Sequence, residues 1–262
     1  MLPAALVVYA AGQAPAPDAA TQEAMVSRIR EVALEYGDRL QNFTCVQLTA
    51  RTIGPSATGP RWKPLETQEM ELNYVDHREH YKLLKVNGET TDLQKRIKSG
   101  YFKGYGQFGS ALQNIFDPKV NAKFEWDHEE TSSGGGTCVF HYSVLQAAST
   151  IVITADLDKV RVGHHGMVWA DCESGAVTRF LTETDPAEVR RLGRRVPLGY
   201  RLEVRYGPVT IGSLEFLLPQ SAVQTALFYK TWTKAEIQFQ QYRKYDANSI
   251  IKFDESGVRP GR

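Results

Sequence analysis

The feature that most constrains the fold is a two-residue alternation of apolar and polar side chains, which recurs along most of the chain after residue 42. Met70, Leu72 and Tyr74, for example, alternate with acidic and amide residues. Such alternation is typical of a strand with one buried face. Parallel strands need helix-length crossovers between them, and no such segment recurs here. The pattern therefore predicts antiparallel meanders of about ten strands in an α+β, mainly antiparallel β fold.

Turn residues separate the expected strands and set their order. Asp76 to Glu79 is polar, and Asn87-Gly88 is a strong hairpin signal. Longer loops are expected at Gly54–Pro64 and Thr182–Gly199. The strand-like segments, from which about ten strands are expected, are 43–51, 70–74, 81–86, 124–128, 138–144, 151–154, 167–170, 176–181, 202–206, 214–218, 223–227, 237–239 and 250–253.

Two segments have a helical period instead. From Thr21 to Gln41 apolar residues recur every three or four positions, which predicts a long helix packed on the sheet. Between Gly106 and Phe116 a shorter apolar pattern ends at Asp117-Pro118, where the proline favours a helix end. This short insert is either a mobile lid or a fixed plug over the open end of the sheet.

The chain is expected to contain one curved-sheet domain over residues 21–254, with a frayed end at 255–262. Residues 1–20 resemble a secretory signal, because an apolar run from Leu2 to Ala11 is followed by small residues and prolines. A basic start is missing, and a disordered apolar tail is the alternative. The 31 Lys and Arg residues balance the 30 Asp and Glu residues, which argues against nucleic acid as a partner. The signal-like segment predicts export to the periplasm or the medium, with a peripheral relation to the cell envelope.

The three cysteines leave more than one pairing open. Cys138 shares a strand face with Phe140, Cys45 lies on the first strand, and Cys172 lies in a turn. If one disulfide forms, we expect Cys45 with Cys138. No CxxC or Cys/His spacing typical of zinc is present, so no metal is predicted.

The sequence contains no recognisable catalytic motif, and no cofactor is predicted. The most enzyme-like fragment is Gly163-His164-His165-Gly166. Adjacent strand residues point to opposite faces, so the two histidines are expected to diverge. A hydrolase that uses His164 or His165 is the weaker alternative to a binding protein.

Two groups of residues are candidates for contact with a ligand or partner. Strand aromatics either line a ligand cavity or belong to an ordinary core. Four arginines in one loop either meet an anion or an acidic partner, or are a solvated surface. The aromatic candidates are Trp126, Phe140, Tyr142, Trp169, Phe216 and Phe239, and the basic candidates are Arg190, Arg191, Arg194 and Arg195.

The order of elements resembles that of the LolA-like superfamily of periplasmic outer-membrane lipoprotein carriers. Exported proteins of soil bacteria such as acidobacteria also look similar in four segments, which are Tyr81–Gly88, Gly106–Pro118, Val168–Arg179 and Phe216–Pro219. The resemblance implies a strongly curved, unclosed sheet whose concave face takes acyl chains, with helices as a lid. The longer loops of this chain depart from that pattern.

Together these observations predict an exported, non-catalytic binding or carrier module for a lipid, a lipoprotein or another apolar ligand. Burial of each ligand CH₂ is worth about 0.8 kcal/mol, so an acyl chain can bind without any catalytic group. The alternative is an envelope protein that presents its sheet edge or its arginines to another protein.

Overall fold

The computed structural model describes residues 16–56, 61–90, 108–132, 135–155, 158–191, 194–228 and 231–246. The start of the expected signal segment, the strand expected at 250–253 and the C-terminal tail lie outside these residues. Fourteen strands and two α-helices are described.

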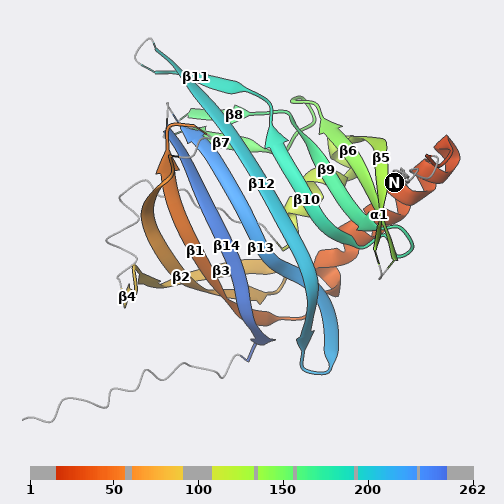
Figure 1. Ribbon diagram of the computed structural model, residues 1–262, viewed down its shortest axis with the longest axis horizontal. Coiled ribbons are helices and arrows are strands. Elements are labelled where there is room, and N and C mark those ends of the chain that lie inside the picture. The colour runs from red at the N-terminus through yellow and green to blue at the C-terminus, as the bar shows by residue number, and fades with distance from the viewer. Residues whose placement is uncertain are drawn as a thin grey trace, which may run out of the picture.

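Twelve of the strands form one antiparallel sheet (Figure 1). Its order is β4-β3-β2-β1-β14-β13-β12-β10-β9-β6-β5, and β11 pairs with β12 beside this path. The two edge strands, β4 and β5, do not pair with each other, so the sheet is unclosed. The predicted α+β, mainly antiparallel fold is confirmed, with twelve strands in the sheet where about ten were expected. The strands are β1 (Phe43–Gly54), β2 (Lys63–Val75), β3 (Arg78–Val86), β4 (Glu89–Thr90), β5 (Lys123–Ser132), β6 (Gly135–Val144), β9 (His164–Asp171), β10 (Val177–Thr184), β11 (Ala187–Arg191), β12 (Arg194–Ile211), β13 (Leu214–Phe228) and β14 (Thr231–Lys244).

The chain builds this sheet as two meanders that meet in its middle. β1 to β4 run outward to one edge, and β5 to β14 return from the other edge until β14 pairs with β1. Asn87 and Gly88 have φ angles of 51° and 82°, as expected for a two-residue hairpin turn. Short turns of this kind keep neighbouring strands antiparallel.

The segment expected as a loop at Thr182–Gly199 is largely β structure, so that prediction was wrong. β10 continues to Thr184, and β11 pairs with the start of β12. Val189, Val196 and Leu198 are buried there, and the small hairpin of β7 (Val152–Ala155) and β8 (Asp158–Arg161) packs against them. Arg190, Arg194 and Arg195 occupy exposed positions between these valines, so the alternation was not recognised in the sequence.

Helix α1 (Ala19–Arg39) forms close to where the helical period predicts it. The side chain of Asp18 caps it by accepting the N–H of Thr21 at 2.7 Å, which satisfies one of the free donors of the first turn. Ile29 and Ala33 are its fully buried residues. Arg28 donates to the carbonyl of Glu173 at 2.8 Å and so joins α1 to the turn after β9.

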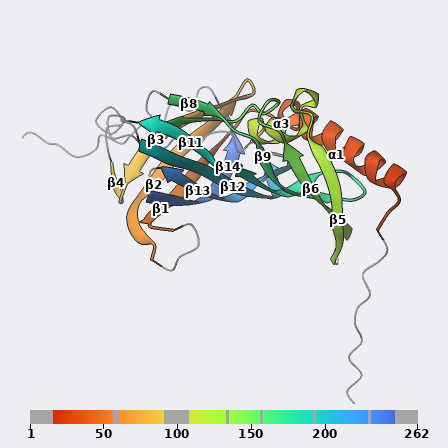
Figure 2. The same ribbon diagram turned by 90° about the horizontal axis from the view of Figure 1, so that it is seen from above.

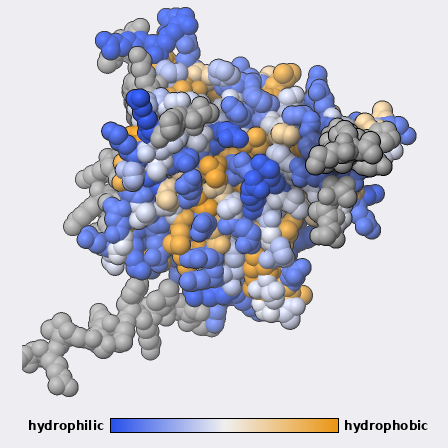
Figure 3. Space-filling view, viewed as in Figure 1, coloured by the Kyte–Doolittle hydropathy of each residue, from blue (hydrophilic) through white to orange (hydrophobic). Residues whose placement is uncertain are grey.

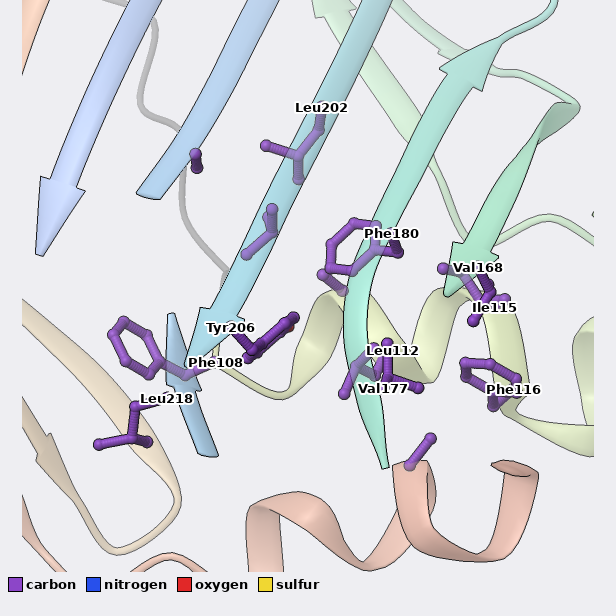
Figure 4. Packing of buried hydrophobic residues seen from close by; sticks show 14 of the residues in the cluster. Phe108, Leu112, Ile115, Phe116, Val168, Val177, Phe180, Leu202, Tyr206 and Leu218 are labelled. Atoms are coloured by element: carbon purple, nitrogen blue, oxygen red, sulfur yellow. The ribbon is translucent and has the colours of Figure 1, made fainter. Parts of the chain in front are cut away.

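Helix α3 (Ser110–Phe116) is the predicted short insert, and it starts four residues later than expected. Both helices lie on the same side of the sheet (Figure 2). A single turn of 3₁₀ helix, η2 (Pro118–Val120), follows α3. Leu112, Ile115 and Phe116 of α3 point at Val168, Val177 and Phe180 of the sheet and form the centre of the core (Figure 4).

The predicted disulfide was wrong. The bond joins Cys138 to Cys172, whose Cα atoms are 5.1 Å apart, and Cys45 is free and buried. Cys45 on β1 and Cys138 on β6 are separated by six strand spacings, or roughly 29 Å along the sheet. A disulfide needs Cα atoms within about 7 Å. Shared apolar character of two strands is therefore a poor guide to pairing.

Candidate functional site

The face of the sheet that α1 and α3 cover is called the inner face here, and the opposite face is the outer face. Seven strands place apolar side chains in register on the inner face and form one row across the sheet. This row, the apolar row, consists of Trp126, Phe140, Val168, Phe180, Val204, Ala222 and Ile237. At the usual strand spacing the row is about 29 Å long.

The apolar row ends at a group of polar side chains on β1 and β2. Ile237 is the partner of Thr49, and Thr49 is in turn the partner of Gln68. Residues of the same strands that alternate with these share the inner face. The polar cluster defined in this way is Gln47, Thr49, Arg51, Glu66 and Gln68.

Hydrogen bonds link most of the polar cluster. Arg51 Nη1 donates to Glu66 Oε1 at 2.8 Å, and Gln68 Nε2 donates to the same oxygen at 2.6 Å. The Arg51 and Glu66 side chains are only 11% and 5% exposed. Because the two charges neutralise each other, the cluster carries no net charge.

Gln47 leaves one atom of the cluster without a partner. Its Nε2 donates to Thr49 Oγ1 at 3.1 Å, whereas its Oε1 has no hydrogen-bond partner among the residues that the structure describes. The residue is only 2% exposed. A buried acceptor without a partner costs about 1–3 kcal/mol, so such atoms are rare in folded proteins. Among the described side chains with such an atom, Gln47 is the one that is itself almost completely buried.

Helix α3 is held on the inner face by a small polar network as well as by its apolar side chains. His164 on β9 is 1% exposed, and its Nε2 lies 3.0 Å from the carbonyl oxygen of Asn114 on α3. Its Nδ1 lies 3.0 Å from Ser149 Oγ, and Thr150 donates to the Asn114 side chain at 2.7 Å. Burial lowers the pKa of His164, so the neutral ring donates to Asn114 and accepts from Ser149.

Four of the predicted aromatic residues lie on the inner face, in the packed part of the core. Trp126 makes an edge contact with Phe140, with ring centroids 5.3 Å apart, and Tyr142 bonds to Thr182 at 2.6 Å. Phe239 is 5.2 Å from Phe108 and lies beside Gln47 through the β1–β14 register. The side chains of this part fill the space between helix and sheet.

The other two predicted aromatics lie elsewhere. Trp169 is on the outer face, where Arg179 covers its ring at 3.9 Å and Glu130 accepts its indole N–H at 3.0 Å. Phe216 is partly buried at the margin of the core. The structure therefore does not bring the six aromatics together into one site.

The four arginines lie at the end of the β11–β12 hairpin. Arg190 pairs in register with Arg195, and Arg191 with Arg194. Arg195 forms an ion pair with Glu188 at 3.2 Å, which reduces the positive charge of the tip. The tip lies at the end of β12, whereas the polar cluster lies on β1 and β2, at least three strands away in the sheet.

The two adjacent histidines diverge as predicted. His165 is on the outer face and faces Asp185 at 3.0 Å, whereas His164 uses both ring nitrogens inside the protein. Ser149 is completely buried and also accepts the N–H of Ile151, so its hydroxyl is not presented to a substrate. No three metal-ligating side chains among the described residues are arranged to hold an ion.

The outer face carries apolar side chains of its own. Figure 3 looks onto this face and shows apolar residues gathered over β12 to β14. Val223 of β13 is 38% exposed there. An open hollow of about 430 Å³ lies beside it, between β3 and β14, with Leu48 and Ala50 at its floor and Glu69 and Lys85 among its walls. Glu69 and Lys85 form an ion pair at 3.2 Å.

Sequence reasoning missed the polar cluster, although a signal for it exists. Along β1 the inner-face positions change from apolar, at Phe43 and Cys45, to polar, at Gln47, Thr49 and Arg51. An amphipathic strand normally keeps one face apolar along its whole length. A polar run at core positions of a strand is therefore the pattern that marks this site.

Comparisons with known proteins give similarity only at the level of solved structures. No protein-family model matches the sequence, and no curated protein matches it significantly. A Vibrio parahaemolyticus structure described as an outer membrane lipoprotein-sorting protein domain is 10% identical with a TM-score of 0.35, over 85% of this chain and 92% of that one. A LolA superfamily protein from Nitrosomonas europaea is 10% identical with a TM-score of 0.33, over 84% and 94%.

A DUF1329 family protein from Desulfovibrio piger is 9% identical with a TM-score of 0.35, over 86% of this chain and 93% of that one. The resemblance to LolA-like proteins that the sequence suggests is thus also found among solved structures, at this level of similarity. Separately, none of the helices in the described part of the chain is both long and apolar enough to cross a membrane.

Proposed function

We propose that this protein is an exported, non-catalytic carrier that takes up an apolar chain on the inner face of its sheet, beneath α3. The observation that carries the proposal is the nature of this cover. α3 has seven residues, far fewer than the 12–15 that an isolated helix needs to be even marginally stable. It therefore depends on its apolar contacts with the sheet, and a ligand that takes over those contacts can displace it.

The free energy gained when α3 docks on the sheet is comparable to the free energy gained when an acyl chain binds there. Burying Leu112, Ile115 and Phe116 stabilises the docked helix by about 5–9 kcal/mol, at 1.5–3 kcal/mol for each side chain. An acyl chain gains about 0.8 kcal/mol per CH₂, so ten buried methylenes give about 8 kcal/mol. Exchange of helix for ligand is then close to balanced, as loading and release by a carrier require.

The Cys138–Cys172 bond supports export, because disulfides persist mainly in oxidising compartments. An expected location in the periplasm or the medium fits a lipid or lipoprotein as cargo. This function needs no cofactor.

The test is whether the protein binds an apolar chain on this face. Native mass spectrometry of gently purified protein is expected to show a co-purified lipid, and the fluorescence of N-phenyl-1-naphthylamine is expected to rise saturably on binding. Ala235→Leu adds a side chain on the inner face next to Ile237 and should weaken probe binding several-fold. Ala50→Leu, on the exposed outer face of the neighbouring strand, is the matched control and should bind as the wild type does.

Lipid-free protein that also fails to bind the probe would contradict the proposal. Equal weakening by both leucine variants would place the probe elsewhere. Thermal unfolding of each variant shows that it is folded before its binding is compared.

A protein-interaction role in the envelope is the second candidate, because the outer face carries an apolar patch (Figure 3) and Val223 of β13 is exposed. In that case Val223→Lys should abolish a concentration-dependent association seen by light scattering and leave probe binding intact. A wild-type protein that stays monomeric at all concentrations would count against self-association through this face.

A further inference from the structure

We infer that the polar cluster binds the headgroup of the ligand, and that this headgroup is uncharged and carries hydrogen-bond donors. The inference rests on the proposed function and names the class of ligand: a neutral amphiphile such as an acylglycerol. The residues that select it are Gln47 and Thr49, with the Arg51–Glu66 pair beside them.

The first observation is the free acceptor. Gln47 Oε1 is buried and has no hydrogen-bond partner in the described part of the chain, and the amide nitrogen of the same side chain is already bonded to Thr49 Oγ1. An O–H or N–H group of a ligand supplies the missing donor. A second acceptor at this position would leave both atoms unsatisfied, so the site discriminates in favour of donors.

The second observation is the position of the cluster. Thr49 lies in register with Ile237, the last member of the apolar row. Gln47 lies in register with Phe239 on one side and Met70 on the other, so apolar side chains flank the free acceptor. A molecule whose chain lies along the row therefore brings its polar end to Gln47 and Thr49.

The third observation concerns charge. Arg51 and Glu66 form a buried ion pair at 2.8 Å, and Gln68 donates to the same carboxylate. A charged headgroup would bring an uncompensated charge into this buried setting, which is costly. Hydroxyl or amide groups carry no such penalty, so the cluster favours them over phosphate, carboxylate or ammonium groups.

The test compares ligands that share one acyl chain and differ in the headgroup. Monopalmitoylglycerol offers two hydroxyl donors, methyl palmitate offers none, and palmitate is charged. Each competes with N-phenyl-1-naphthylamine for the wild-type protein. Monopalmitoylglycerol is expected to bind about tenfold more tightly than methyl palmitate and also more tightly than palmitate, in line with the pairing of one buried acceptor.

Gln47→Leu then removes the acceptor, and Gln238→Leu, at an exposed outer-face position of β14, is the matched control. The first variant should lose the tenfold preference for the glycerol ester while it keeps its affinity for the methyl ester. It should also unfold at the same or a higher temperature than the wild type, because it no longer buries an unpaired polar atom. The control should keep the preference.

The outcomes separate the two proposals. If the probe and all three lipids fail to bind, the carrier function itself is wrong. If the lipids bind with equal affinity, or Gln47→Leu keeps the preference, the headgroup inference is wrong and the carrier function stands. A Gln47→Leu variant that keeps its fold but is strongly destabilised would show a purely structural role for the glutamine, and would also overturn the inference.

Discussion

The three cysteines have different chemistry because they occupy different environments. Cys138 and Cys172 tie β6 to the turn after β9, next to the point where Arg28 of α1 bonds to the carbonyl of Glu173. Cys45 is enclosed in the core beside Tyr242, and burial raises the pKa of its thiol to about 12. The reactive form of a cysteine is the thiolate, so Cys45 is inert while the protein is folded.

This difference predicts a stepwise count of thiols. Iodoacetamide at pH 8 should label no cysteine in the native protein, only Cys45 after unfolding in denaturant, and all three cysteines after unfolding with a reductant. Mass spectrometry of the intact chain measures the added mass at each step. Labelling of Cys138 or Cys172 without reductant would contradict the disulfide, and the spectrum of the reduced sample is the control for complete reaction.

Single positions on the strands were predictable from the sequence only in part. Alternation correctly assigns Phe140 and Tyr142 to the buried face. It does not say whether a buried aromatic fills a core or lines a site, because both need an apolar side chain at the same position. Polar residues at core positions, such as Gln47 and Glu66, are more informative, since the core alone gives no reason for them.

At the scale of elements, the two helices follow from their period, but their role does not. α1 has a capped start and an ion pair between Arg39 and Glu35 one turn apart, so part of its stability is local. α3 begins at Gly109 without a side-chain cap and depends on the sheet beneath it. This difference depends on packing against residues distant in the sequence, and the local pattern of a helix does not identify those residues.

The bond between His164 and Asn114 makes the docking of α3 dependent on pH. The charges that act on His164 are those of Asp185, which favours its protonation, and His165, which opposes it; burial outweighs both and lowers the pKa. In the unfolded chain a histidine titrates near 6.5. The stability that neutral His164 contributes is therefore complete above about pH 6.5 and is lost as the pH falls towards the lower pKa of the folded state.

Urea unfolding between pH 7.5 and pH 5 tests this linkage. The wild type should lose stability over this range, whereas His164→Gln should be less stable at pH 7.5 and lose less on acidification. His165→Gln is the control, because His165 is exposed and faces Asp185, and it should follow the wild-type curve. Parallel pH curves for the wild type and the His164 variant would exclude His164 as the titrating group.

At the scale of the whole molecule, the antiparallel sheet and its hairpins were predictable, and its central seam was not. Turn residues such as Asn87 and Gly88 fix each hairpin locally. The pairing of β1 with β14 joins residues 178 to 201 positions apart, and no local signal encodes it. The apolar row meets the polar cluster at this seam, between Ile237 and Thr49, so their alignment exists only in the assembled sheet.

The exchange of α3 for a ligand predicts opposite changes in two parts of the molecule. When monopalmitoylglycerol binds, amide hydrogen exchange should become faster in α3 (Ser110–Phe116), because its contacts with Val168 and Phe180 pass to the acyl chain. Exchange in β1 and β14 should become slower, because a ligand that binds only the folded state raises the free energy of unfolding. α1 also packs against α3, but it should change less than α3, since Arg28 bonds it to the disulfide-linked turn.

Hydrogen exchange followed by mass spectrometry measures all three regions in one experiment. Slower exchange in α3 together with the sheet would mean that the ligand binds without displacing this helix, as a second layer on an intact core. Gln47→Leu gives the sharper comparison. With methyl palmitate, α3 of this variant should still exchange faster. With monopalmitoylglycerol, the variant should show the same exchange as with methyl palmitate, because the acceptor for the headgroup has been removed. Helix α3 and the polar cluster would then act separately on one face of the sheet. Any apolar chain would displace α3, and the polar cluster would bind the headgroup attached to that chain.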